Sequence, residues 1–260
     1  MADNRMQNFL KLLNIAPQKH KSIAVVGGGG KTSLIFRLAE ELLIQGQKVI
    51  ITTTTHMAYE PSKPFALHGD ASAVREALSS QGMVIAAEYD SSTGKISSLS
   101  SQKLKGLTEY GAILLIEADG ARRMPVKIPE DWEPVIPDFV QLVIGVIGLD
   151  CLDRPIFKTA YSAENLAFFL DKTELDSITS TDLFKIAVSE SGLRKDVQKR
   201  EFRVYFNKAD VLGEIARAEE LVKKLKEAGV QSSYGSLIFR KSPNFSENLN
   251  PCESLKENEQ

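Results

Sequence analysis

Residues 22–55 read SIAVVGGGGKTSLIFRLAEELLIQGQKVIITTTT, and this stretch decides the fold. It begins with a short apolar run rich in β-branched residues and ends with a second one, and both runs are typical of buried strands. Between them, four glycines precede a segment with helical periodicity that stops at Gly46. Strand, glycine loop, helix and strand form a βαβ unit, which predicts a parallel sheet with a right-handed crossover.

The alternation of strand and helix patterns continues along the chain. Further strands are expected at residues 83–89, 112–120, 139–150, 202–210 and 236–240. Further helices are expected at residues 4–13, 71–82, 161–171, 180–191 and 213–228. A stretch rich in Ser, Thr and Gly, residues 91–101, predicts a turn region. The whole pattern therefore predicts a three-layer α/β fold with a mainly parallel sheet.

Composition excludes several classes of protein. The chain has 260 residues, 43% hydrophobic and 25% charged, as in ordinary globular proteins. Its net charge of −2 argues against non-specific binding of DNA or RNA. No apolar run reaches the roughly eighteen residues of a membrane helix, and the first residues do not resemble a secretory signal. With only Cys151 and Cys252, no disulfide framework is expected, and a cytoplasmic setting is predicted.

The glycine loop is the strongest functional signal. Its glycines would let backbone N–H groups curl around an anion at a helix N-terminus. Lys31 would reach the β- and γ-phosphates, and the Thr32 hydroxyl would ligate Mg²⁺. The loop is a shortened G-x-x-G-K-T, because Val25 stands where the usual pattern has its first glycine; Mur-type ligases use a loop of similar length. The alternative is a tight turn that only packs strand against helix. The nucleotide-binding candidates here are Gly27, Gly28, Gly29, Gly30, Lys31, Thr32 and Ser33.

Two strand ends add candidates around the predicted nucleotide. Glu117 and Asp119 end an apolar strand, where a carboxylate can hold Mg²⁺ or orient water, and Gly120 frees a backbone N–H near a γ-phosphate. Which acid contacts the metal is left open, and two solvated acids are the alternative. The threonines 52–55 follow the second strand, and Thr54 is the candidate for nucleotide contact. Their alternative role is to complete the strand.

A third strand end carries Asn207-Lys208-Ala209-Asp210, the N-K-x-D pattern that reads guanine in GTPases. The Asp210 carboxylate would accept hydrogen bonds from guanine N1–H and from the exocyclic amine, which adenine does not offer there. Asn207 and the Lys208 stem would brace the base and the loop. The alternative is a turn that caps a helix.

Basic and thiol groups complete the candidate set, with their roles left open. Arg122, Arg123 and Lys127 could stabilise phosphate charge or recognise an anionic second ligand, or they could belong to a solvated loop. Cys151 is expected to be a buried structural residue, with a metal-binding thiol as the alternative.

The segments VVGGGGKTS, VIITTTTHM, IEADGARRMPVKIP, EPVIP and VIGLD together resemble the YqeC-like proteins, over roughly residues 22–210. These are described as candidate accessory factors for selenium-dependent molybdenum hydroxylases. The resemblance implies a role in maturing a molybdenum enzyme or its cofactor. The Glu117-x-x-Gly120 and N-K-x-D elements are also similar to those of metallochaperone GTPases that serve nickel and cobalamin enzymes.

The sequence therefore predicts a P-loop NTPase-like domain at residues 18–241, after a helical segment (1–17) and before a disordered tail (242–260). The leading hypothesis is Mg²⁺-dependent binding and hydrolysis of GTP, with ATP less favoured, in which Lys31, Glu117 and Asp119 are the catalytic candidates. A molybdenum hydroxylase or a cofactor-assembly protein is the expected partner. The alternatives are an ATP-dependent transferase or ligase acting on a small acid or cofactor precursor, and a nucleotide-binding scaffold without significant turnover.

Overall fold

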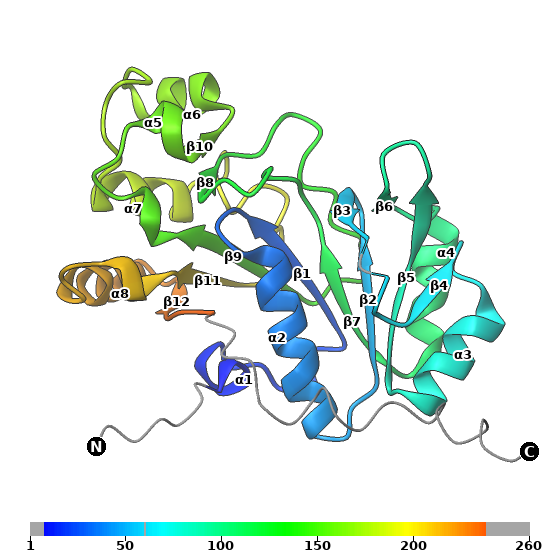
Figure 1. Cartoon of the computed structure of the whole chain (residues 1–260). Helices are drawn as coiled ribbons and strands as arrows, with labels where there is room; N and C mark the ends of the chain where they lie inside the picture. Colours follow the sequence, from blue (N-terminus) through cyan, green and yellow to red (C-terminus); the bar gives the residue numbers. More distant parts are fainter. Residues whose placement is uncertain (1–7, 60, 238–260) are drawn as a thin grey trace, which may run out of the picture.

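The computed structural model describes residues 8–59 and 61–237, and within them ten strands form one sheet (Figure 1). The strands are β1 (Ser22–Gly27), β2 (Val49–Thr53), β3 (His56–Ala58), β4 (Phe65–Leu67), β5 (Met83–Asp90), β6 (Lys95–Ser97), β7 (Ile113–Glu117), β9 (Leu142–Gly148), β11 (Glu201–Asn207) and β12 (Gln231–Tyr234). Their path is β12-β11-β9-β1-β7-β2-β5-β6-β3, and β4 pairs with β5. Strand β6 is antiparallel to β3 and β5, and the other pairings are parallel, which confirms the prediction of a mainly parallel sheet.

Helices cover both faces of the sheet and make the fold three-layered. They are α1 (Phe9–Leu12), α2 (Lys31–Ile44), α3 (Ala71–Ser80), α4 (Ser101–Gly106), α5 (Ile156–Thr159), α6 (Ala163–Leu170), α7 (Ser180–Val188) and α8 (Ala216–Glu227). Side chains alternate between the faces of a strand. In β1, Ile23 and Val25 therefore join the core under α1 and α2, whereas Ala24 and Val26 join the core under α3 and α4. Helices α5 to α8 share a further core with β9 and β11.

The helical insertion that follows β9 is tied back to the sheet by a small pairing. Strands β8 (Val126–Lys127) and β10 (Ala160–Tyr161) form a parallel two-stranded sheet. This pairing links the segment after β7 to helices α5 and α6, which lie above the carboxyl ends of the strands in Figure 1. The Met124 carbonyl just before β8 accepts from the Gly29 amide at 2.9 Å, which holds this segment close to the glycine loop.

The first described helix depends on a contact from another part of the chain. Asn8 caps α1 by accepting from the Lys11 amide at 2.8 Å. The amides of Phe9 and Leu10 donate to the buried Glu41 carboxylate of α2 at 3.0 and 2.9 Å. The helix expected at residues 4–13 is therefore present from Phe9 to Leu12, and its first residues lie outside the described part.

Several boundaries predicted from the sequence are wrong. The second strand ends at Thr53, so Thr54 and Thr55 lie in a bend. The supposed turn region 91–101 contains β6, because Lys95–Ser97 pairs with two neighbouring strands. The last strand is β12 rather than residues 236–240, because Ser236 turns towards Asp210. Residues 238–240 of that prediction and the tail lie outside the described residues.

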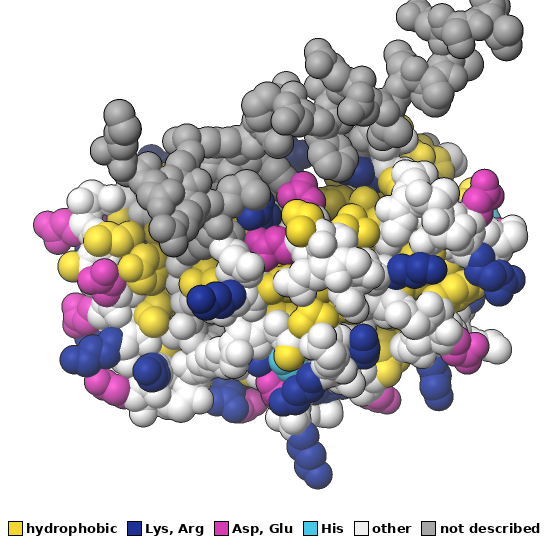
Figure 2. Space-filling model, turned by 90° about the horizontal axis from the view of Figure 1, so that it is seen from below, with side chains coloured by type: hydrophobic (Ala, Val, Ile, Leu, Met, Phe, Trp, Pro, Cys, Tyr) yellow, Lys and Arg dark blue, Asp and Glu magenta, His cyan; other side chains and the backbone are white. Residues whose placement is uncertain are grey.

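The edge of the sheet opposite the glycine loop has no charge of one predominant sign. Seen from below, the basic and acidic side chains of the described residues are interspersed with apolar and uncharged ones (Figure 2). No helix within residues 8–59 and 61–237 is long and apolar enough to cross a membrane.

Candidate functional site

The candidate residues from four distant segments meet at one edge of the sheet. Strand β1 lies between β7 and β9, and β11 pairs with β9 on the far side. All four strands are parallel, so their carboxyl ends share an edge, and ligands of open α/β sheets bind beyond such ends. The register places Val25 opposite Glu117, Gly27 opposite Val146 and Asn207 opposite Gly148. The glycine loop, the acidic strand end and the N-K-x-D element are therefore neighbours.

The glycine loop is packed tightly against the rest of the protein. Gly29 has a φ of 75° and Gly30 a φ of 130°, conformations that other residues rarely adopt. A Cβ at Gly29 would collide with the backbone of Gly148, and one at Gly30 would collide with the Asn207 side chain. A Cβ at Gly28 would lie 2.7 Å from the Met124 carbonyl oxygen. Packing alone accounts for these glycines, so their presence does not distinguish a phosphate loop from a tight turn.

The backbone amides distinguish two parts of the loop. Gly27 donates to Asp119 Oδ2 at 2.8 Å, Gly28 to the Val146 carbonyl at 2.9 Å and Gly29 to the Met124 carbonyl at 2.9 Å. The next four amides, of residues 30–33, have no acceptor within residues 8–59 and 61–237, and no side chain caps α2. The free donors lie at the first turn of α2, where the helix dipole also favours an anion.

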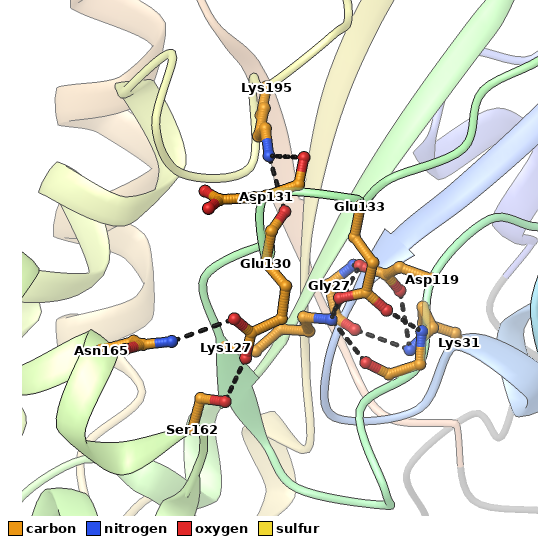
Figure 3. A network of polar contacts seen from close by, with 11 residues as sticks. Gly27, Lys31, Asp119, Lys127, Glu130, Asp131, Glu133, Ser162, Asn165 and Lys195 are labelled. Carbon is orange, nitrogen blue, oxygen red and sulfur yellow. Dashed lines mark hydrogen bonds and ion pairs between the residues drawn. The ribbon is translucent and has the colours of Figure 1, made fainter.

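Lys31 lies inside a chain of alternating charges (Figure 3). It is 5% exposed, and its Nζ donates to the Gly27 carbonyl at 2.6 Å and lies 3.0 Å from Asp119 Oδ1. The other Asp119 oxygen lies 3.8 Å from Nζ of Lys127. Lys127, fully buried, also donates to the Gly120 carbonyl at 2.5 Å and pairs with Glu133. The described structure thus places Asp119 between two ammonium groups.

The carboxyl of Glu133 closes this chain of charges. Burial would raise the pKa of Glu133, but hydrogen bonds from Lys127 and from the Gly120 amide bring it below its ordinary value. The Gly120 amide, predicted to face a γ-phosphate, donates to Glu133 Oε1 at 3.1 Å. Because Lys127 is buried and paired, the solvated-loop interpretation is wrong for this residue. Sequence reasoning did not find Glu133, which lies in the segment EPVIP.

Thr32 and Glu117 form a second pair at the start of α2. The Thr32 hydroxyl donates to Glu117 Oε2 at 2.6 Å. Burial raises the pKa of Glu117, an effect that Lys31 and the Thr32 hydrogen bond oppose. The described residues contain no cluster of three or more His, Cys, Asp or Glu that could hold a metal ion by themselves. A hydroxyl and one carboxylate do fit Mg²⁺, which usually takes one or two protein oxygens together with waters and phosphates.

The threonine run is used mainly inside the protein. Thr52 donates to the Ala86 carbonyl at 2.7 Å and Thr53 to the Glu117 carbonyl at 3.0 Å, and both are buried. The Thr54 hydroxyl donates to the Val135 carbonyl at 2.8 Å, so it anchors the segment after Gly120. These contacts correspond to the structural role that the sequence left open.

The N-K-x-D element is attached directly to the glycine loop. Asn207 Nδ2 donates to the Gly29 carbonyl at 2.7 Å, and its Oδ1 accepts from the Leu237 amide at 3.1 Å. Asp210 is exposed, and its carboxylate accepts from the Ser236 hydroxyl, while the Asp210 amide donates to Ser236 Oγ at 3.0 Å. Lys208 has a left-handed backbone and pairs with Asp150 at 2.7 Å. Sequence reasoning missed Ser236 because it assigned this residue to a strand.

The remaining two candidates differ in accessibility. Cys151 is buried with 0% exposure, and burial raises the pKa of its thiol far above the ordinary range. The thiolate is the form that binds metal, so this burial favours the structural role for Cys151. Arg122 and Arg123 are exposed and form a turn directly after Gly120.

Comparison with known proteins gives two matches. The family described as YqeC protein matches residues 23–164. The "Uncharacterized protein YqeC" of Escherichia coli (strain K12) is 32% identical over 233 residues, which cover 85% of this chain and 89% of that protein. No solved structure matches the chain. The matched residues include the glycine loop, the acidic strand end and the Arg122-Arg123 turn, and the chain belongs to the YqeC family.

Proposed function

We propose that this protein binds and hydrolyses a nucleoside triphosphate, with GTP preferred, in a Mg²⁺-dependent manner. One observation carries the proposal. The Asn207 side chain donates to the Gly29 carbonyl, so the N-K-x-D element lies next to the α2 amides that have no acceptor in the described part of the chain. A base and a phosphate of one nucleotide could therefore reach both elements together. A tight structural turn does not require that arrangement.

The phosphate would bind at the first turn of α2. The amides of residues 30–33 have no acceptor among residues 8–59 and 61–237, and the helix dipole adds a partial positive charge there. Lys31 carries its ammonium group on a flexible four-carbon stem and would exchange the Gly27 carbonyl for a phosphate oxygen. The contacts of Gly28 and Gly29 with Val146 and Met124 stay in place in this arrangement.

Thr32 and Glu117 would hold Mg²⁺. Their oxygens are 2.6 Å apart in the described structure, and an ion held by both would replace this hydrogen bond, with the neutral hydroxyl binding through its oxygen. Mg²⁺ would neutralise negative charge on the phosphates during transfer. Asp119 is less suited to metal binding, because its oxygens already face Lys31 and the Gly27 amide. We therefore assign Asp119 to the positioning of Lys31 and of the loop.

Asp210 would select the base. Its exposed carboxylate can accept from the N1–H and amino groups of guanine, and Ser236 fixes the orientation of that carboxylate. Adenine offers no donor pair at these positions, so GTP is favoured over ATP.

The biological role that we propose is that of an accessory factor in the maturation of a molybdenum hydroxylase or its cofactor in the cytoplasm, which is what the resemblance to the YqeC-like proteins implies. The two comparisons support the family membership on which this proposal rests. A nucleotide-dependent transferase is the second candidate. The exposed Arg122 and Arg123 beside the site favour it, because a transferase must bind a second, anionic substrate.

Nucleotide titrations test the proposal. GDP, GTP and ATP are titrated with Mg²⁺ against the wild-type protein, Lys31→Met and the control Lys48→Ala, which changes an exposed lysine just before β2. We expect GTP to bind more tightly than ATP, Lys31→Met to lose at least about tenfold in affinity, as loss of one charge-assisted hydrogen bond implies, and the control to match wild type. Phosphate release separates hydrolysis from binding alone. Absence of nucleotide binding by the wild-type protein would refute the proposal.

A further inference from the structure

The turn after Gly120 has an unusual sequence for its backbone conformation. The Met124 amide donates to the Ala121 carbonyl at 2.8 Å, which closes a four-residue turn. Its central residues, Arg122 and Arg123, have φ values of 44° and 65°. Two positive φ values are the pattern of a type I′ turn, which strongly prefers Asn-Gly. Arginine at both positions places each Cβ in a sterically unfavourable, left-handed conformation.

Neither guanidinium of this turn is neutralised by a carboxylate of the described residues. Arg122 and Arg123 are exposed, and they form no ion pair or hydrogen bond in the described part of the chain. The Arg122 guanidinium lies 5.5 Å from the centroid of the Tyr161 ring, which also faces Lys127 at 5.0 Å. The stacking holds Arg122 in place and leaves its N–H groups available to a ligand.

The turn lies against the candidate phosphate site. Met124 follows Arg123 directly, and its carbonyl accepts from the Gly29 amide at 2.9 Å. Ala121, the first residue of the turn, follows Gly120, whose carbonyl accepts a hydrogen bond from Lys127. The two guanidinium groups are therefore carried by a backbone that contacts the glycine loop at one end and the acidic strand end at the other.

We propose that Arg122 and Arg123 form a binding site for a phosphoryl oxyanion beside the glycine loop, an inference that deepens and rests on the proposed function. A strained backbone persists where the surrounding structure enforces it, and such strain gathers at functional sites. Here the strained positions carry two cations that have no ion-pair or hydrogen-bond partner among the described residues, when smaller residues would suit the turn better. Guanidinium groups bind phosphoryl oxygens with paired hydrogen bonds. The oxyanion belongs either to the terminal phosphate of the nucleotide or to a separate phosphorylated ligand.

The double variant Arg122→Asn/Arg123→Gly tests this site without damaging the turn. Asn-Gly suits a type I′ turn, so the variant should melt at or above the wild-type temperature. The matched control is Arg75→Gln, which removes another exposed arginine stacked on a tyrosine, 6.0 Å from the Tyr110 ring centroid, on α3. Each protein is titrated with GDP, a non-hydrolysable GTP analogue and tripolyphosphate in Mg²⁺ at fixed ionic strength, and the GDP-loaded protein with inorganic phosphate.

Two results support the proposal and separate the sources. If the oxyanion is the terminal phosphate, the double variant binds GDP like wild type and loses at least about tenfold in affinity for the GTP analogue. If it belongs to a second ligand, both nucleotides bind normally and the GDP-loaded variant loses phosphate binding. A double variant that matches wild type within twofold for every probe overturns the proposal. So does a lower melting temperature, because it contradicts the strain on which the inference depends.

The same titrations separate this inference from the proposed function. Nucleotide binding that requires Lys31 but is unaffected in the double variant retains the proposed function and refutes the arginine site. If the wild-type protein binds tripolyphosphate through the two arginines but binds no nucleotide, the proposed function fails and the oxyanion site remains. If the wild-type protein binds none of the probes, both fail.

Discussion

The exchange Asp210→Asn gives the sharpest test of guanine recognition. The wild-type carboxylate can accept two hydrogen bonds from guanine, one from N1–H and one from the amino group. An asparagine amide keeps one acceptor but places an NH₂ donor opposite the guanine amino group. Xanthine carries a carbonyl oxygen in place of that amino group, so it restores the match. The variant should therefore lose affinity for GDP and gain affinity for xanthosine diphosphate.

The structure sets the size of this effect. Asp210 is exposed, so each charge-assisted hydrogen bond to the base is placed at the lower end of the usual range, about 1.5 kcal/mol. The bond to N1–H remains in the variant, so loss of the bond to the amino group amounts to about 1.5 kcal/mol, or roughly a tenfold weaker Kd for GDP. The Ser236 hydroxyl can donate to an asparagine oxygen as it does to the carboxylate, so the side chain should keep its orientation. Most of the lost affinity should return with the xanthine base.

Isothermal titration calorimetry with GDP and xanthosine diphosphate in Mg²⁺ measures both affinities. The control is Asp138→Asn, which changes an exposed aspartate just before β9. It should leave both affinities unchanged. The reasoning is refuted if Asp210→Asn binds GDP with wild-type affinity. It is also refuted if the variant loses affinity for GDP without gaining affinity for xanthosine diphosphate.

Four further changes probe the site and its surroundings. Because the pKa of Glu117 is raised above 4.5, Mg²⁺-dependent nucleotide affinity should fall as the pH decreases through that raised pKa, and Glu117→Gln should bind weakly without this pH dependence. Without ligand, ionising Glu117 is unfavourable in the folded state, so the free energy of unfolding should fall as the pH rises from 4.5 to the raised pKa. Asn207→Ala removes one buried and one partly buried hydrogen bond and should cost about 2–4 kcal/mol in urea unfolding. Lys127→Met leaves Glu133 without its buried cation and should cost about 3–5 kcal/mol. Cys151 should resist a thiol reagent in the native protein and react after denaturation.

Each of these predictions has a contrasting outcome. An identical pH dependence in wild type and Glu117→Gln would assign the titration to another group. A stability of Asn207→Ala within about 0.5 kcal/mol of wild type, the range of ordinary surface substitutions, would mean that the loop does not depend on this side chain. For Lys127, the double variant Lys127→Met/Glu133→Gln should regain part of the lost stability, because it removes the uncompensated charge. Rapid native labelling of Cys151 would restore the possibility of a thiol ligand.

The elements that could be predicted from the sequence are those with a strong local pattern. Helix α2 has an apolar face at helical spacing, and its flanking strands are apolar throughout. The sequence therefore predicts a helix buried on one face and strands buried on both. Strands β3, β4 and β6 have three residues each, too few for a period to emerge. They exist because distant neighbours supply hydrogen-bond partners, and those partners are not encoded locally.

The candidate site divides in the same way. That the loop and the strand ends lie together could be predicted, because parallel strands bring their carboxyl ends to one edge of the sheet. The hydrogen-bond or ion-pair partner of each polar group could not be predicted. The Gly29 amide donates to the Met124 carbonyl, and the Lys127 ammonium group pairs with the Glu133 carboxylate. Both contacts join residues from different segments. Glycines suited to an anion and glycines required by packing look identical in sequence, and only the occupied amides tell them apart.

The alternating charges around Asp119 explain how Lys31 could leave its place when a phosphate arrives. Removing one partner of a buried ion pair normally leaves an uncompensated charge, at a cost of about 3–5 kcal/mol. Asp119 would not be left alone, because Lys127 Nζ lies 3.8 Å from one of its oxygens and the Gly27 amide donates to it at 2.8 Å. Lys127 is itself fixed by Glu133 and the Gly120 carbonyl, so it stays when Lys31 moves. The second lysine would thus lower the cost of releasing the first, so that under the proposed function the two lysines would act together in binding phosphate.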